Sequence, residues 1–293
     1  MADGIIISAA LLRLHSPSGK QLWCSCGEVR IEMRTSLLTV VLLGVFAVVG
    51  VNRMSAQITP RHHLFTELLS TYVHDGIVNY NEMRSDKGLA EYVARLATFN
   101  PETLPNEKEK LAFWINAYNA YTLRVICDNY PIESINDLHS GGLIIGSIFK
   151  TTVWDKGLVT VGGKTISLNT IEHEIIHPVF KDARAHFALV CASKSCPPLR
   201  SEAYEAEILD WQLDDQGRAF LSDPFRNEFD PMKKRAELSK IFSWYESDFG
   251  SSEEAVLRYV ARFLPDSISR QILTNPGEWK INYKSYDWSL NGN

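Results

Sequence analysis

A cysteine-containing segment past the middle of the chain holds the residues best suited to chemistry. Residues 185–200 read AHFALVCASKSCPPLR, with His186 ten positions before Cys196 and Cys191 between them. A nearby imidazole favours the thiolate form of cysteine, which is the nucleophilic form. Two prolines follow Cys196, and they remove backbone donors and stiffen its loop. This pattern predicts a reactive Cys196 with His186 as its base.

The same two cysteines allow two other interpretations. Cys191 and Cys196 could pair as a small-loop disulfide in an oxidising compartment. Either one could instead be an inert thiol in the core, because free cysteine is among the most buried residue types. The residues alone leave these possibilities open.

An acidic and a basic side chain stand next to each other on a short predicted helix. The segment LNTIEHEIIH follows a capping residue, Ser167 or Asn169, and we expect it to end at Pro178. Neighbouring residues of a helix point about 100° apart, so Glu172 and His173 do not pair with each other. We expect one of them to face the site and orient the catalytic imidazole.

The same helix contains the string H-E-x-x-H, from His173 to His177. On a longer helix, two histidines at this spacing hold zinc and the glutamate acts as general base. Here Pro178 follows the second histidine directly, so the helix is expected to stop there. We therefore expect no metal and no other cofactor, and a His177 that is solvated or locally capped.

Two asparagines interrupt the strongest predicted helix, which starts near Asn106 and ends before Pro131. Asn116 and Asn119 lie three apart in the sequence FWINAYNAYTL. Asparagine is a poor interior helix former because its amide competes for backbone hydrogen bonds. The pair predicts a polar spot on an aromatic helix. The two amides either bond a neighbouring loop or act as donors facing a site.

The remaining pattern predicts the elements that must position these groups. Helical periodicity is found at 62–74, 88–99, 203–221 and 251–263. Alternation typical of strands is found at 149–168, 185–191, 236–242 and in the tail. These elements lack a regular strand–helix rhythm and predict an α+β fold. We expect a single domain over residues 57–293, with the central buried helix packed against a small, mostly antiparallel sheet.

The first 56 residues form a separate extension. Residues 37–51 are an uncharged apolar run of 15 residues. That is shorter than the roughly 20 residues of a membrane-spanning helix and typical of a signal-peptide core. If translation starts at Met33, the run follows the basic residue Arg34 and forms either a cleaved signal or an uncleaved anchor. Both alternatives predict an exported, extracytoplasmic body that meets a membrane only through this segment.

The composition excludes several classes of protein. Hydrophobic residues make up 45% of the chain and charged residues 22%, as in a globular domain rather than a disordered one. Thirty Lys and Arg against 35 Asp and Glu give a net charge of -5. No basic surplus is available to neutralise phosphates, so we expect no nucleic-acid partner and a small-molecule or peptide substrate.

Five ordered blocks resemble the family catalogued as domain of unknown function 547. They are KLAFWINAYNAYTL, ISLNTIEHEII, DARAHFALVCASKSCPPLR, KIFSWYESDFG and YDWSLN, from about Leu111 to Asn291. The family has no settled activity, so the resemblance leaves the reaction open. Its pattern matches Glu172 and His173 but not His177, which weakens the zinc interpretation. Members that look cytosolic carry the same two-cysteine segment, which implies more than a structural disulfide.

These residues together predict a thiol-dependent hydrolase, or an acyl or amide transferase. The expected catalytic residues are Cys196, His186, Glu172, His173, Asn116 and Asn119. The cysteine would attack, the imidazole of His186 would be its base, and an asparagine amide would stabilise the oxyanion. A second hypothesis is a non-catalytic module that binds a peptide or glycan in the same cleft. A third is a metal-dependent hydrolase that uses His173, His186 and a cysteine.

Overall fold

The computed structural model describes residues 62–138 and 152–293. Residues 59–293 form one compact unit. The predicted extension over residues 1–56, with its apolar run at 37–51, lies outside the described residues. Within the described ranges, no helix combines the length and apolar character needed to cross a membrane.

The first half of the described chain is mainly helical. Its elements are α2 (His63–Tyr72), β1 (Val73–His74), β2 (Ile77–Val78), α3 (Tyr80–Met83), α4 (Lys87–Thr98), η1 (Pro101–Thr103), α5 (Glu107–Asn129), η2 (Ile135–Leu138), η3 (Val153–Asp155), β3 (Val159–Val161), β4 (Lys164–Ile166) and η4 (Thr170–Phe180).

The second half mixes short helices with three further strands. Its elements are α7 (Ala185–Ala188), η5 (Ala206–Ile208), α8 (Leu209–Ser222), β5 (Glu228–Asp230), β6 (Arg235–Leu238), α9 (Ile241–Trp244), α10 (Glu246–Phe249), α11 (Glu253–Val260), η6 (Ala261–Phe263), α12 (Asp266–Thr274), η7 (Pro276–Glu278) and β7 (Lys280–Tyr283).

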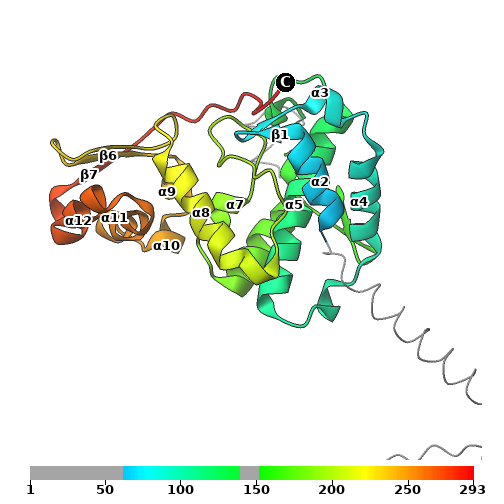
Figure 1. Ribbon diagram of the computed structural model, residues 1–293, viewed down its shortest axis with the longest axis horizontal. Coiled ribbons are helices and arrows are strands. Elements are labelled where there is room, and N and C mark those ends of the chain that lie inside the picture. Colours follow the sequence, from blue (N-terminus) through cyan, green and yellow to red (C-terminus); the bar gives the residue numbers. More distant parts are fainter. Residues whose placement is uncertain (1–61, 139–151) are drawn as a thin grey trace, which may run out of the picture. The chain divides into compact units, whose positions relative to one another are not determined.

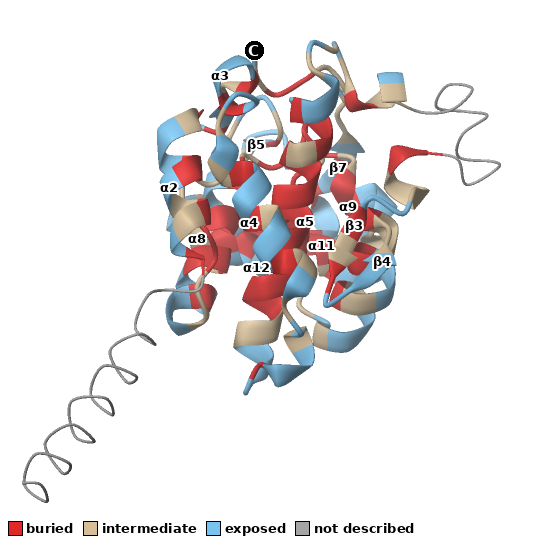
Figure 2. Cartoon of the chain, turned by 90° about the vertical axis from the view of Figure 1, so that its right-hand side faces the viewer, coloured by how far each residue is buried: buried red, intermediate tan, exposed pale blue. Residues whose placement is uncertain are grey.

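Helix α5 is buried along most of its length (Figure 2). It begins after Asn106, whose side chain accepts a hydrogen bond from the backbone of Glu109. Glu107 and Glu109 complement the dipole of its first turn. Its main neighbours are the helices α4 and η4. The α+β class is confirmed, but the central helix packs against helices where a sheet was expected.

The strands form three small sheets in the described part of the chain. β1 pairs with β2, and β3 with β4, as antiparallel hairpins. The third sheet has the order β5–β6–β7, in which β6 is antiparallel to β5 and parallel to β7. Gly162 and Gly163 turn the β3–β4 hairpin with φ of 58° and 77°, which suits glycine. The described part of the predicted 149–168 segment consists of this hairpin preceded by the short helix η3.

Two apolar clusters make up the core. One surrounds α5, and the other is built around β6 and α11; they occupy opposite sides of the view in Figure 1. Helix α8 joins them, because Leu213 belongs to the first cluster and Phe220 to the second. Helix α7 lies at the same junction, with Ala188 in the first cluster and Phe187 in the second.

Candidate functional site

A cavity of about 280 Å³ opens at the junction of the two clusters. Its aromatic lining consists of Tyr118, Trp154, Trp244, Tyr245, Tyr286 and Trp288. Its polar and sulfur lining consists of Asn169, Glu172, His173, His186, Cys191 and Cys196. Four of the six predicted catalytic residues therefore meet here: Glu172, His173, His186 and Cys196.

The segment predicted as a strand at 185–191 is instead one turn of helix, α7, followed by extended chain. The side chain of Asp182 accepts a hydrogen bond from the backbone of Arg184, which starts the turn. After the turn, the amide of Asn119 bonds both the Ala188 carbonyl and the Val190 N–H. The Asn119 side chain thus makes the backbone hydrogen bonds that a neighbouring strand would make. Alternation of residue types within the segment does not show which of the two partners is present.

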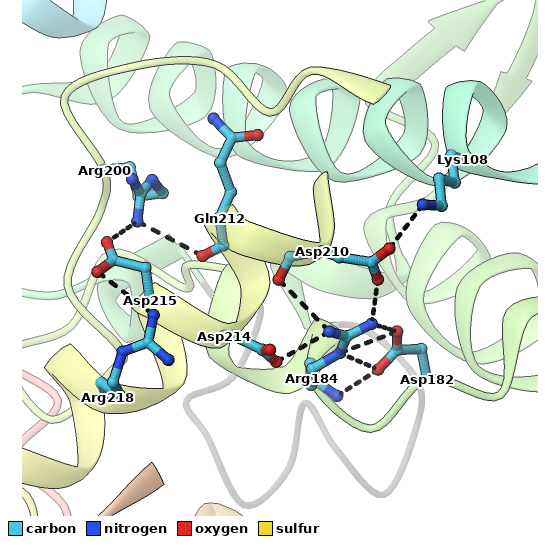
Figure 3. A network of polar contacts seen from close by, with 9 residues as sticks. All are labelled: Lys108, Asp182, Arg184, Arg200, Asp210, Gln212, Asp214, Asp215 and Arg218. Atoms are coloured by element: carbon cyan, nitrogen blue, oxygen red, sulfur yellow. Dashed lines mark hydrogen bonds and ion pairs between the residues drawn. The ribbon is translucent and has the colours of Figure 1, made fainter. Parts of the chain in front are cut away.

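The orientation of α7 is fixed by a charged network around Arg184 (Figure 3). Its guanidinium pairs with Asp182 and Asp210 at 2.7 Å each and with Asp214 at 2.9 Å. Lys108 of α5 pairs with the same Asp210 at 2.6 Å. The network joins α5, α7 and α8, and so fixes the turn that carries His186.

His186 is buried and hydrogen-bonded to a carboxylate. Its Nε2 lies 2.8 Å from Oδ2 of Asp248. Burial lowers the pKa of this imidazole, although the bond to Asp248 acts in the opposite direction. The ring is therefore neutral at pH 7, and its orientation is set by Asp248. No hydrogen bond among the described residues joins His186 to either thiol of the pocket, contrary to the predicted His186–Cys196 pair.

Tyr245 contacts both Glu172 and His186. Its hydroxyl donates to Oε1 of Glu172 at 2.6 Å, and its ring lies 4.1 Å from that of His186. Burial, followed by the charge of Glu172, raises the pKa of Tyr245, so its hydroxyl keeps the proton. His173 also stacks on Tyr245, with ring centres 6.1 Å apart.

The predicted end of the helix at Pro178 is wrong. Residues Thr170–Phe180 form a π-helix, η4, with Pro178 inside it. In an α-helix the proline ring would clash with the carbonyl four residues earlier, and the wider π-turn relieves this clash. The helix therefore continues, and His177 is carried into the site instead of being solvated or capped.

His177 packs against the other histidines. Its side chain is 14% exposed, and its ring lies 4.2 Å from His186 and 5.5 Å from His173. Burial, and then the neighbouring His186, lower the pKa of His177 to about 4. Nε2 of His177 is buried, and none of the described residues offers it a hydrogen-bond partner.

Cys191 is the accessible thiol of the site. Its Sγ lies 3.0 Å from Sγ of Cys196, 3.2 Å from Oγ of Ser193 and 3.4 Å from the Tyr286 hydroxyl. The side-chain hydrogen bond with Cys196 is the largest cause that lowers the pKa of Cys191, and it outweighs the effect of burial. The thiolate form of Cys191 is therefore favoured relative to that of an ordinary cysteine.

Cys196, the predicted nucleophile, is buried with 2% exposure. Burial raises the pKa of its thiol well above the ordinary value, and the adjacent Cys191 adds to the effect. The thiol of Cys191 donates to Sγ of Cys196 at 3.0 Å, and the same sulfur accepts the backbone N–H of Cys191 at 2.9 Å. Cys196 itself donates toward the carbonyl of Leu189 at 3.7 Å. Of the two thiols, Cys191 rather than Cys196 is the more exposed one, and its pKa is the one that is lowered. Both are free thiols, not a disulfide.

The C-terminal tail holds the loop that carries both thiols. Backbone N–H groups of Lys194 and Ser195 donate to carbonyls of Ser289 and Asp287, and the N–H of Asn291 donates to the Ala192 carbonyl. Ala192 has φ of 63°, a left-handed conformation that costs energy for a residue other than glycine. These bonds maintain the tight turn that brings the two sulfurs together.

Asn116 and Asn119 are buried, and neither lines the cavity. Asn116 donates to the carbonyl of Tyr204 and accepts its N–H, just as Asn119 does with Ala188 and Val190. The amides thus fix the two ends of the cysteine loop. The structure thus shows the alternative in which the two amides bond a neighbouring loop. Because both amides bond backbone groups, they do not point toward the position of an oxyanion in the cavity.

Three residues of the site were not expected from the sequence. Asp248 and Tyr245 lie in the block KIFSWYESDFG, and Tyr286 lies in the tail near YDWSLN. Both blocks resemble the family, and this resemblance was the only feature of the sequence that could have pointed to these three residues. Neither block has a local spacing that points to His186 or Cys191.

Two sets of side chains could hold a metal ion. They are Glu172, His173 and His177, and His177, His186 and Asp248; in each set the ligand atoms lie within 4.8 Å of one another. Imidazoles with one carboxylate also form catalytic zinc sites. The expected set of His173, His186 and a cysteine is not found in the described ranges.

Comparison with known proteins gives one family. The model described as "Protein of unknown function, DUF547" matches residues 101–221. That range contains α5, η4, α7 and the cysteine loop, and it ends before Asp248 and Tyr286. No curated protein and no solved structure matches the chain.

Proposed function

We propose that this chain, whose residues 101–221 match the DUF547 family model, is a thiol-dependent hydrolase or acyl transferase whose nucleophile is Cys191. The observation that carries this proposal is a partly exposed thiol that lines a cavity together with histidines and a carboxylate. Cys191 lines the pocket with His173, His186 and Glu172, and its pKa is lowered to about 7. A thiolate is the reactive form of cysteine in acyl transfer.

The neighbouring groups have matching roles. The thiolate of Cys191 attacks an acyl carbonyl and expels the leaving group, which leaves a thioester. Because burial keeps His186 neutral at pH 7, its imidazole acts as the base for the water or acceptor that cleaves the thioester. Asp248 is the positioning residue that orients this imidazole, as the carboxylate does in Ser–His–Asp enzymes.

The lining suggests the kind of acyl group. Trp154, Trp244, Tyr286 and Trp288 form a continuous aromatic wall, with neighbouring ring centres 4.6 to 5.9 Å apart. Such a wall provides a large rigid apolar surface on which a planar or apolar group packs. We propose a substrate whose acyl portion presents such a surface. The same wall would serve a binding module without catalysis.

Brief alkylation with iodoacetamide tests the proposal. We expect Cys191 to react first at pH 7, with a rate that rises with pH and is half-maximal near pH 7. Cys127 is the internal control, because burial raises its pKa to about 12. Peptide mass spectrometry ranks the sites. Equally slow labelling of Cys191 and Cys127 would contradict the thiol mechanism and favour the binding module.

The histidine cluster supports a second candidate, a metal-dependent hydrolase. The buried Nε2 of His177 has no partner in the described part of the chain, and His177 belongs to both possible ligand sets. A bound metal would polarise a carbonyl or activate water. This candidate predicts about one zinc ion per chain after dialysis, and its loss in His177→Ala. Elemental analysis decides, since a wild-type protein that retains no zinc at pH 7 would eliminate this candidate.

A further inference from the structure

The two pocket thiols differ in exposure although their sulfurs touch. Both cysteines line the cavity, but Cys191 is partly exposed, whereas Cys196, with its sulfur 3.0 Å away, is only 2% exposed. A solute that enters the pocket reaches Cys191 first. Whatever becomes attached to Cys191 then lies within reach of Cys196. This is the geometry of an attacking thiol with a resolving thiol.

We propose that Cys191 and Cys196 carry out thiol–disulfide exchange, and reduce an organic disulfide that binds against the aromatic wall. The proposal rests on the nucleophilic Cys191 of the proposed function and adds an activity of the pair. It assigns to Cys196 a chemical role that acyl transfer does not require.

The reaction has two balanced steps. In the first, the Cys191 thiolate attacks one sulfur of the substrate disulfide, the substrate S–S bond breaks, and one thiolate leaves. In the second, that leaving thiolate takes the proton of Cys196, whose sulfur attacks Cys191 and expels the other substrate thiolate, which water protonates. The substrate is reduced to two thiols, and the protein is oxidised to a Cys191–Cys196 disulfide. An external dithiol restores the reduced pair.

The loop can accommodate this disulfide with little movement. A disulfide bond is about 2.05 Å long, so the sulfurs must approach by about 1 Å from their present 3.0 Å. The turn between the cysteines is already closed by the hydrogen bond from the Cys196 N–H to the Ser193 carbonyl. The tail bonds at Ala192 and Lys194 hold the same turn from outside.

The difference between the thiols also sets the order of the steps. Burial raises the pKa of Cys196, while the side-chain hydrogen bond between the two cysteines lowers the pKa of Cys191. The first attack therefore belongs to Cys191. Cys196 becomes reactive only when a mixed disulfide on Cys191 places a sulfur against it.

The test treats the reduced full chain with 5,5′-dithiobis(2-nitrobenzoate), an aromatic disulfide, and maps the peptides by mass spectrometry. We expect wild-type protein to yield a Cys191–Cys196 linked peptide. Cys196→Ser should stop at the mixed disulfide on Cys191, and Cys191→Ser should leave Cys196 unmodified. Cys127→Ser is the matched control, since it removes a buried thiol outside the site and should behave as wild type.

Two outcomes would overturn the proposal and leave the proposed function intact. One is a stable mixed disulfide on Cys191 in wild-type protein with Cys196 still reduced. The other is modification of Cys196 in the Cys191→Ser variant as fast as that of Cys191 in wild type. Failure of Cys191 to react with either the disulfide or iodoacetamide would refute both proposals at once.

Discussion

Replacing Cys196 with alanine should slow the alkylation of Cys191 about 15-fold at pH 7, while replacing it with serine should preserve most of the rate. Alanine removes the side-chain hydrogen bond between the two cysteines, which is the largest cause of the low pKa of Cys191. The pKa should then rise from about 7 toward the roughly 8.5 of a free cysteine. The ionised fraction at pH 7 would fall from about one half to about 3%.

The serine variant is the matched control for this experiment. Its hydroxyl can still donate to Cys191 and accept the backbone N–H that Cys196 now accepts. The measurement is the pH profile of the alkylation rate at Cys191 in all three proteins. The midpoint should move to higher pH in Cys196→Ala and stay near that of wild type in Cys196→Ser. Identical midpoints in all three would show that Cys196 does not stabilise the thiolate.

The local chemistry of the sequence was enough to predict the central helix. Asn106 is a strong cap, Glu107 suits the first turn, and Pro131 follows the end of the helix at Asn129. The apolar residues that surround the helix predicted its burial. These signals lie within one turn of the residues they affect, so they can be read without knowledge of the fold.

The structure brings most of the predicted site residues into one pocket, and their catalytic roles stay predictions. His186, Glu172, His173 and Cys196 do line the pocket. Which cysteine is exposed, however, depends on the tail near Asn291, which folds back on the loop from about a hundred positions away. The partner of His186 is Asp248, 62 residues later. Contacts at such separations leave no periodic or capping signal in the sequence.

The π-helix is a second case where local rules were insufficient. Pro178 normally ends an α-helix, and this rule led us to dismiss His177. The chain instead widens its turn and continues to Phe180, because η4 packs on α5. The tertiary contact outweighs the local preference, and His177 joins the histidine cluster as a result.

Replacing Asn119 with alanine should destabilise the protein by about 2–5 kcal/mol. The change leaves two buried backbone groups, the Ala188 carbonyl and the Val190 N–H, without their partner. Each unsatisfied buried group costs roughly 1–3 kcal/mol, and Asn119 is buried. Urea denaturation should show the loss as a lower midpoint.

Asn129→Ala is the matched control, because Asn129 lies on the same helix but is exposed at its end. Its side chain bonds one carbonyl, that of Val125, and we expect a change of the unfolding free energy within about 0.5 kcal/mol.

A second measurement separates the effect of Asn119 on stability from its effect on the position of the thiol. Asn119 holds the chain between His186 and Cys191, so the folded fraction of Asn119→Ala should also alkylate Cys191 more slowly than wild type. Equal stability of the two variants would contradict the assignment of Asn119 as a clamp on this loop, and an unchanged alkylation rate would show that the clamp does not position the thiol.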